Sequence, residues 1–123
     1  ETLVEKVHEV MEEAVKDGNI VVAGWGGQIH FKNSEDAFHI RIIGSHDTRV
    51  RYLMNTAGVT LTGAEETIRQ ADRDHSLFSQ YFFNADFSDL KLYHFVLNLD
   101  QISHDEMTEM ISNVVIEIIP QST

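Results

Sequence analysis

Three short apolar runs, separated by stretches of helical periodicity, constrain the fold of this chain most strongly. They read NIVVAG at 19–24, AFHIRIIG at 37–44 and LYHFVLNLD at 92–100. The first is a short β-branched run bounded by glycine, which is typical of a strand buried on both faces of a sheet, and we interpret the other two as a second and a third strand. Because strands that alternate with helices pair in parallel through right-handed crossovers, we predict an α/β fold, a small layered domain with a parallel sheet.

The segments between these runs have the apolar spacing and the start and stop signals of amphipathic helices. Apolar side chains recur on one face from Leu3 to Val15, and Gly18 follows as a stop signal. Ser45 is a candidate N-cap for a helix that ends at Gly58. We therefore expect a helix before the first apolar run and another after the second.

Two capping boxes predict two further helices. TGAE at 62–65 and SHDE at 103–106 both place Glu three residues after a hydroxyl side chain. The end of the last helix is open, because the β-branched density of VVIEII at 114–119 favours a strand, whereas the apolar stripe that follows the capping box favours a helix. We interpret this segment as helical to about Val115.

Charge and composition exclude several classes of function. Twenty acidic and nine basic residues give a formal net charge of −11, which repels nucleic acids and anionic membranes. The absence of cysteine indicates the reducing cytoplasm and excludes thiolate chemistry. No run approaches the length of a membrane-spanning helix, so we expect no direct membrane insertion. The 123 residues fit a single domain, and the start at Glu1 suggests a piece of a larger protein.

The stretch VVAGWGGQ at 21–28 contains the first candidate binding residues. Gly24, Gly26 and Gly27 surround Trp25, which is the only tryptophan of the chain. We interpret the glycines as a tight turn more readily than as a phosphate cradle, since the lysine of a phosphate-binding loop is missing. Trp25 either packs over the end of the sheet or stacks on the base of a ligand, and packing is the commoner outcome.

The order of the motifs resembles the C-terminal portion of the cytidylate kinases, and in particular the cytidylate kinase-like proteins. The resemblance runs from about Val15 to Val114 and rests on four stretches in the same order: GNIVVAGWGGQ, DAFHIRIIGSHDTRVRYLM, GAEETIRQADRDHSLFSQYF and LYHFVLNLDQISHDEM. Asn98, which follows the last strand, matches an asparagine of the family. The resemblance implies a truncated P-loop nucleoside monophosphate kinase fold. It also implies that a strand missing from these residues would lie between those equivalent to 20–23 and 38–43.

The same resemblance implies that the catalytic chemistry is lost. The chain has no phosphate-binding G-x-x-x-x-G-K-[ST] loop. Trp25 stands where the family has an arginine that binds the substrate phosphate, and Ala71, His75 and Phe78 stand where arginines of the lid are common. Arg49 and Arg73 are the remaining matches, although an arginine in the position of Arg49 is more often a surface or salt-bridge residue.

These losses lead to a hypothesis of function. The chain is interpreted as a degenerate, non-catalytic cytidylate kinase-like domain that serves as a dimerisation or regulatory module. Its expected partners are a second copy or other domains of a larger protein, and a nucleotide ligand would make it a sensor. The alternative is the C-terminal part of an active nucleoside monophosphate kinase whose phosphate-binding loop lies outside the chain. The candidate ligand-binding residues are Gly24, Trp25, Gly26, Gly27, Ser45, Arg49 and Arg73.

Two other groups of side chains have competing interpretations. No two of the seven histidines have the H-x-x-x-H spacing of a helical zinc site, so we expect no metal ion and no cofactor. His39 and His94 lie inside predicted strands, where a buried neutral imidazole is expected. The aromatic run LFSQYFFNADF at 77–87 is either core or a surface for a partner.

Overall fold

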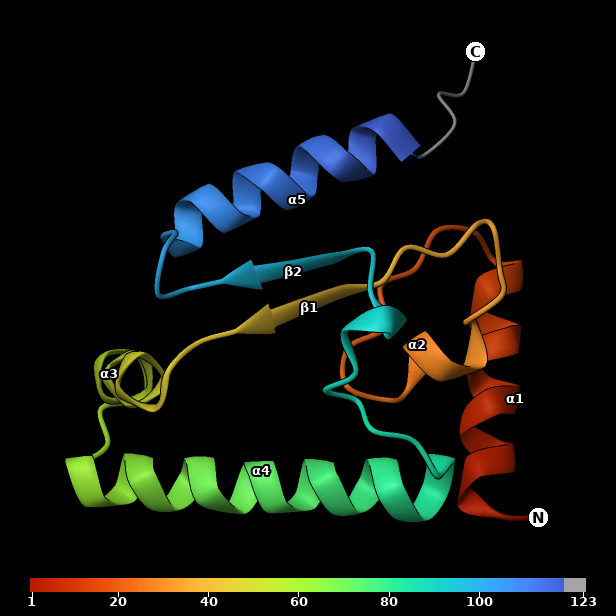
Figure 1. The fold of residues 1–123 in the computed structure, drawn as a ribbon. Helices are drawn as coiled ribbons and strands as arrows, with labels where there is room; N and C mark the ends of the chain where they lie inside the picture. Colours follow the sequence, from red (N-terminus) through yellow and green to blue (C-terminus); the bar gives the residue numbers. More distant parts are fainter. Residues whose placement is uncertain (119–123) are drawn as a thin grey trace. The chain divides into compact units, whose positions relative to one another are not determined.

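The computed structural model describes residues 1–118. Helices and strands follow one another along the chain as shown in Figure 1. In order they are α1 (Leu3–Lys16), α2 (Gly27–His30), β1 (Ile40–Ile43), α3 (His46–Ala57), α4 (Leu61–Phe83), the 3₁₀ helix η1 (Leu90–Leu92), β2 (Phe95–Asn98) and α5 (His104–Ile118). This is a mixed helix and strand fold with a parallel sheet.

The sheet consists of β1 and β2, which lie side by side and run in the same direction (Figure 1). The register pairs Ile40 with Phe95 and Ile43 with Asn98. Backbone hydrogen bonds extend the pairing by one residue at each end, from His94 N–H to the His39 carbonyl at 2.7 Å and from Leu99 N–H to the Ile43 carbonyl at 2.9 Å. The parallel arrangement predicted from the alternation of strands and helices is confirmed.

The first apolar run does not form the expected strand. Residues 19–23 have no regular structure, and the side chain of Val21 is 96% exposed. Among residues 1–118, neither β1 nor β2 has a second neighbour with which this run could have paired. A buried parallel strand needs hydrogen-bonding partners and covered faces. Without both, the β-branched residues at 20–22 cannot fix the segment as a strand, and the prediction of three strands is wrong.

The chain divides into two compact units, and the first comprises residues 1–39 and 66–94. It contains α1, α2, most of α4 and η1. Met11, Ile68 and Phe87 are its buried apolar side chains. Phe83 contacts both Phe78 and Phe87, with ring centroids 5.2 and 5.6 Å apart. Tyr81 and Phe82 are exposed, so the aromatic run supplies core residues and also surface residues.

The second unit comprises residues 40–65 and, among the described residues, 95–118. It contains both strands, α3, the first residues of α4, and α5. Val50 and Ala64 are its buried apolar residues. The apolar side chains of the strands remain accessible, with Ile42 49% and Phe95 46% exposed. The sheet of this unit is therefore incompletely covered.

Side chains cap the N-termini of α1, α3, α4 and α5. Thr2 and Glu5 form a capping box at α1, and Ser103 and Glu106 form the predicted box at α5. Ser45 is the N-cap of α3 as predicted, because its hydroxyl accepts a hydrogen bond from Thr48 N–H. Each cap pairs backbone donors that the first helical turn leaves without a partner.

The fourth helix begins two residues before the start that a capping box at 62–65 would give. The hydroxyl of Thr60 accepts from Gly63 N–H, and the Thr60 carbonyl accepts from Ala64 N–H, so α4 begins at Leu61. The expected capping box at 62–65 is therefore wrong, because Thr60 is a competing hydroxyl two residues upstream. The helix then continues through the aromatic run to Phe83.

The last helix confirms the helical interpretation of its C-terminal segment over the described residues. α5 extends to Ile118, beyond the expected end near Val115, and Ile119 lies outside the described residues. The apolar stripe at i, i+3 and i+4 therefore predicts this segment better than its many β-branched residues do. A β-branched residue lowers helix stability by less than about 1 kcal/mol, so several of them do not prevent a helix.

Candidate ligand site

The glycine turn of the first unit is built for packing. Gly24 and Gly26 have φ angles of 79° and 78°, in the left-handed region that L side chains rarely adopt. Gly26 is buried, and a Cβ at this position would lie 2.5 Å from the ring of Phe83. Gly26 is also the residue before α2, which begins at Gly27. The glycines allow the chain to turn closely against α4, as the tight-turn interpretation predicts.

Trp25 lies at the surface of this turn. Its ring meets Phe78 edge to face, with centroids 6.0 Å apart and an interplanar angle of 87°. The residue is nevertheless 54% exposed. The indole therefore packs on α4 and also keeps accessible surface on which a planar group could stack.

Gln28 and Tyr93 fix the segment after the turn. Gln28 Nε2 donates to the Tyr93 hydroxyl at 3.2 Å, and that hydroxyl donates to the carbonyl of Phe87 at 2.6 Å. The sequence analysis missed this pair, because the two residues are separated by 65 positions. A polar side chain directly after a glycine turn was the only signal.

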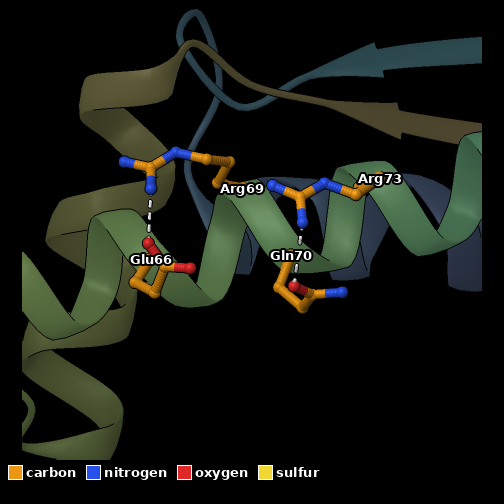
Figure 2. A network of polar contacts seen from close by, with 4 residues as sticks. All are labelled: Glu66, Arg69, Gln70 and Arg73. Carbon is orange, nitrogen blue, oxygen red and sulfur yellow. Dashed lines mark hydrogen bonds and ion pairs between the residues drawn. The ribbon is translucent and has the colours of Figure 1, made fainter.

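The two arginines of α4, Arg69 and Arg73, are exposed, and Figure 2 draws their polar contacts. Arg69 forms an ion pair with Glu66, whereas Arg73 Nη1 donates to the amide oxygen of Gln70 at 3.4 Å. Gln70 in turn donates to Asp74 Oδ1 at 2.8 Å. Arg73 thus has a neutral hydrogen-bond partner, and its charge can still attract an anion.

In the second unit, the end of β1 meets the N-terminus of α3 at Ser45. The backbone N–H of Ser45 donates to Asp100 Oδ1 at 2.9 Å, and Asp100 follows β2. This hydrogen bond is the main reason that the pKa of Asp100 lies below its ordinary value of 3.8, and Thr48 adds a further bond. A carboxylate of the chain itself therefore lies where a helix N-terminus would otherwise attract a phosphate.

Arg49 is partly buried on α3. Its Cγ lies 3.7 Å from the position of a Cβ on Gly44, so the aliphatic part of the side chain passes beside the end of β1. The adjacent Arg51 donates from Nη2 to the Thr48 hydroxyl at 3.4 Å. A hollow of about 420 Å³ on this unit is lined by Asp47, Val50, Arg51, Met54 and Leu61, and thus by none of the predicted binding residues.

The predicted binding residues fall into two groups. Gly24, Trp25, Gly26, Gly27 and Arg73 belong to the first unit. Ser45 and Arg49 belong to the second unit, where Asp100 joins them. Asp100 was missed because its partner is 55 residues away in the sequence. The structure therefore describes two separate sets of residues.

The histidines of the described chain do not gather into a metal centre. No group of three or more His, Asp or Glu side chains within residues 1–118 is arranged to hold a metal ion. His39 lies just before β1, where its Nε2–H donates to the Phe31 carbonyl at 3.2 Å and burial lowers its pKa. His94 is exposed, in contrast to the expected buried state, and its Nδ1 accepts from His39 N–H at 2.9 Å.

Within residues 1–118, no helix has both the length and the apolar character needed to span a bilayer.

Comparisons with known proteins give one similar solved structure and one matching family profile. No curated protein matches the chain significantly. A crystal structure of an uncharacterized protein from Eubacterium ventriosum ATCC 27560 is similar, with a TM-score of 0.76 and 16% sequence identity. The match covers 93% of this chain and 63% of that one, so this chain spans less than two thirds of the similar protein. At this identity the likeness concerns the fold alone.

A family profile gives the more specific result. The profile of the cytidylate kinase-like family matches residues 1–101, which include the glycine turn, both strands and α4. The chain therefore belongs to the cytidylate kinase-like family.

Proposed function

We propose that this chain is a non-catalytic cytidylate kinase-like domain that acts as a dimerisation or regulatory module. The observation that carries the proposal is the incompletely covered sheet. Two parallel strands with half-exposed Ile42 and Phe95 form an unusual surface, since parallel sheets normally have both faces covered. A sheet of two strands is also only marginally stable by itself. Association would cover these side chains and pair an outer edge of the two-stranded sheet.

The proposed partner is a second copy of the chain. A two-fold interface brings the same patch of both copies together, so Ile42 would contribute twice to the buried surface. The strand residues are uncharged except for Arg41, and the bulk of the net charge of −11 lies elsewhere in the sequence. Two copies could therefore meet at the sheet with little repulsion between acidic side chains.

The absence of catalysis is proposed from the residues that would have to bind phosphate. An indole at Trp25 offers one N–H donor and no charge. At the N-terminus of α3, the carboxylate of Asp100 holds Ser45 N–H and would repel a phosphate group. His75, which stands at a lid position, contacts Phe87 with ring centroids 5.3 Å apart. These positions favour binding without turnover, or no nucleotide binding.

The solution mass of the 123-residue chain tests the assembly role. Light scattering should give a dimer, and Ile42→Lys should weaken association by about tenfold or more, because a charge would be buried at the interface. Val10→Lys is the matched control, since Val10 is an exposed apolar residue of α1 in the other unit. A monomeric chain, or equal effects of the two substitutions, would contradict the assembly role.

Nucleotide titration tests the sensor form of the proposal. If Trp25 stacks on a base, its fluorescence should change on saturation with CMP or ATP, and Trp25→Leu should remove the binding heat in calorimetry. A flat fluorescence response together with no heat would leave assembly as the function.

A second candidate is the C-terminal part of an active nucleoside monophosphate kinase. It is favoured by one finding, that the chain covers only 63% of the similar crystal structure. Sequencing the coding region upstream of Glu1 and assaying the complete gene product for phosphate transfer from ATP to CMP separates the candidates. A phosphate-binding loop with CMP-dependent turnover would establish the kinase and overturn the non-catalytic proposal.

A further inference from the structure

Two imidazoles and a carboxylate connect α1 to α2 within the first unit. The rings of His8 and His30 have centroids 4.2 Å apart, with an interplanar angle of 33°. His30 Nε2–H donates to Glu12 Oε1 at 2.6 Å. His8 and Glu12 lie one turn apart on α1, so both face the same short helix. We call these three residues the α1 latch.

His8 is the unusual member of the α1 latch. Its Nε2 is buried and has no hydrogen-bond partner. On its other side the ring contacts Phe83 of α4, with centroids 5.8 Å apart. A protonated His8 would therefore bury a charged Nε2–H beside a second imidazole, without an acceptor for its proton.

The charges around His8 determine how it responds to acid. Burial is the main cause that lowers the pKa of His8 below its ordinary value of 6.5, and His30 lowers it further. Glu12 acts in the opposite direction, since a carboxylate favours the cation. From α4 the contacting residue is Phe83, which is uncharged. The packed arrangement therefore prefers neutral His8.

We propose that the α1 latch is a pH-sensitive device that holds α1 on α2 while His8 is neutral and releases α1 when His8 takes up a proton. Protonation adds a positive charge 4.2 Å from the ring of His30, whose own N–H is already bound to Glu12. Once α1 moves away, water can solvate the imidazolium of His8. The latched state is fully favoured above the ordinary histidine pKa and is lost as the pH falls below it.

Release of α1 would also affect the glycine turn that carries Trp25. Phe83, which contacts His8, also fills the space beside Gly26. His30 ends α2, which begins directly after the turn that carries Trp25. Loss of the latch would therefore loosen the support of Trp25. This inference is independent of whether the chain dimerises or binds a nucleotide.

Hydrogen exchange of the 123-residue chain tests the device. Amide protection of α1 is compared at about pH 7.5 and about pH 5.5, after correction for the intrinsic pH dependence of exchange. In the wild type, the corrected protection of α1 should fall several-fold at the lower pH, because the pKa of His8 is below its ordinary value while α1 is latched and returns to that value on release. Equal corrected protection at the two pH values would overturn the proposal.

Three variants make the test specific. His8→Phe keeps an aromatic ring against Phe83 but cannot ionise, so α1 should stay protected at both pH values. His30→Gln keeps a donor for Glu12 and should reduce the pH response, which provides a second test if His8→Phe does not fold. His46→Gln is the matched control, because His46 is exposed in the other unit, and it should respond as the wild type does. A response of His8→Phe and His30→Gln equal to that of the wild type would assign the pH effect to other groups.

Discussion

Ser45 and Asp100 join the ends of the two parallel strands, through a hydrogen bond of 2.9 Å from the backbone N–H of Ser45 to Asp100 Oδ1. Ser45 follows β1 and caps α3, whereas Asp100 follows β2. The Asp100 carboxylate, which lies in the loop after β2, therefore stabilises the N-terminus of α3. Both the hydrogen bond and the dipole of α3 favour its charged form.

Acid unfolding tests this role of Asp100. Its folded-state pKa is lowered by the Ser45 N–H, so its contribution to stability is present above the ordinary pKa of 3.8 and is lost as the pH falls through the lower folded value. We expect Asp100→Asn to flatten the stability profile in this acidic range, as measured by circular dichroism at graded pH. Glu109→Gln, an exposed carboxylate of α5, should leave the wild-type profile unchanged.

Substitution of Gly26 should be more damaging than substitution of Gly24. Both have positive φ, so alanine introduces backbone strain of about 1–2 kcal/mol at either position. Only at Gly26 does the new methyl group meet Phe83, at 2.5 Å, whereas nothing lies within 4 Å at Gly24. Gly26→Ala should therefore cost about 1–3 kcal/mol more than Gly24→Ala in urea unfolding. Equal losses of unfolding free energy in the two variants would show that the Phe83 ring moves aside at little cost.

His39 should make folding stability depend on pH near neutrality. Burial lowers its pKa below 6.5, so the neutral form stabilises the fold above that value, and this contribution is lost as the pH falls below it. His39→Gln keeps a donor for the Phe31 carbonyl but does not ionise. Urea unfolding between about pH 7.5 and about pH 5.5 should show a smaller change for His39→Gln than for the wild type. If the unfolding free energy of His39→Gln changed with pH as much as that of the wild type, the pH dependence would belong to another group.

The capping box of α5 should contribute measurably to stability. Ser103→Ala removes the acceptor of Glu106 N–H and should cost about 1 kcal/mol of unfolding free energy. Ser112→Ala, at an exposed position within the same helix, removes a hydroxyl without removing a cap and should have little effect. Thermal unfolding followed by circular dichroism distinguishes the two variants.

Local patterns predicted the parts of the fold that depend on neighbours in the sequence. The N-caps at Ser45 and Ser103 are confirmed, because each bonds to a backbone N–H three residues ahead. The glycine turn is confirmed for the same reason, since positive φ at Gly24 and Gly26 is a local property. The start of α4 was missed because two nearby threonines can both cap a helix, and Thr60 accepts the capping hydrogen bond in place of Thr62.

The errors and omissions concern contacts between distant residues. The run at 20–23 has the composition of a strand, but strand formation also requires a neighbour, and Val21 is almost fully exposed. The pairs Ser45 with Asp100 and Gln28 with Tyr93 bring together residues 55 and 65 positions apart. A single sequence does not indicate which distant residue will be the partner, because no local pattern at Ser45 points to Asp100 and none at Gln28 points to Tyr93.

The parallel register also has a consequence for the synthesis of the protein. His39 and His94, which extend the pairing of β1 and β2, are 55 residues apart in the chain. At roughly 5–20 residues per second, a ribosome needs several seconds to supply β2 after β1 is complete. During this interval β1 has no strand to pair with, so its apolar side chains and backbone groups lack the partner that β2 later supplies. A nascent chain of this protein is therefore expected to need a chaperone most while α3 and α4 are being translated.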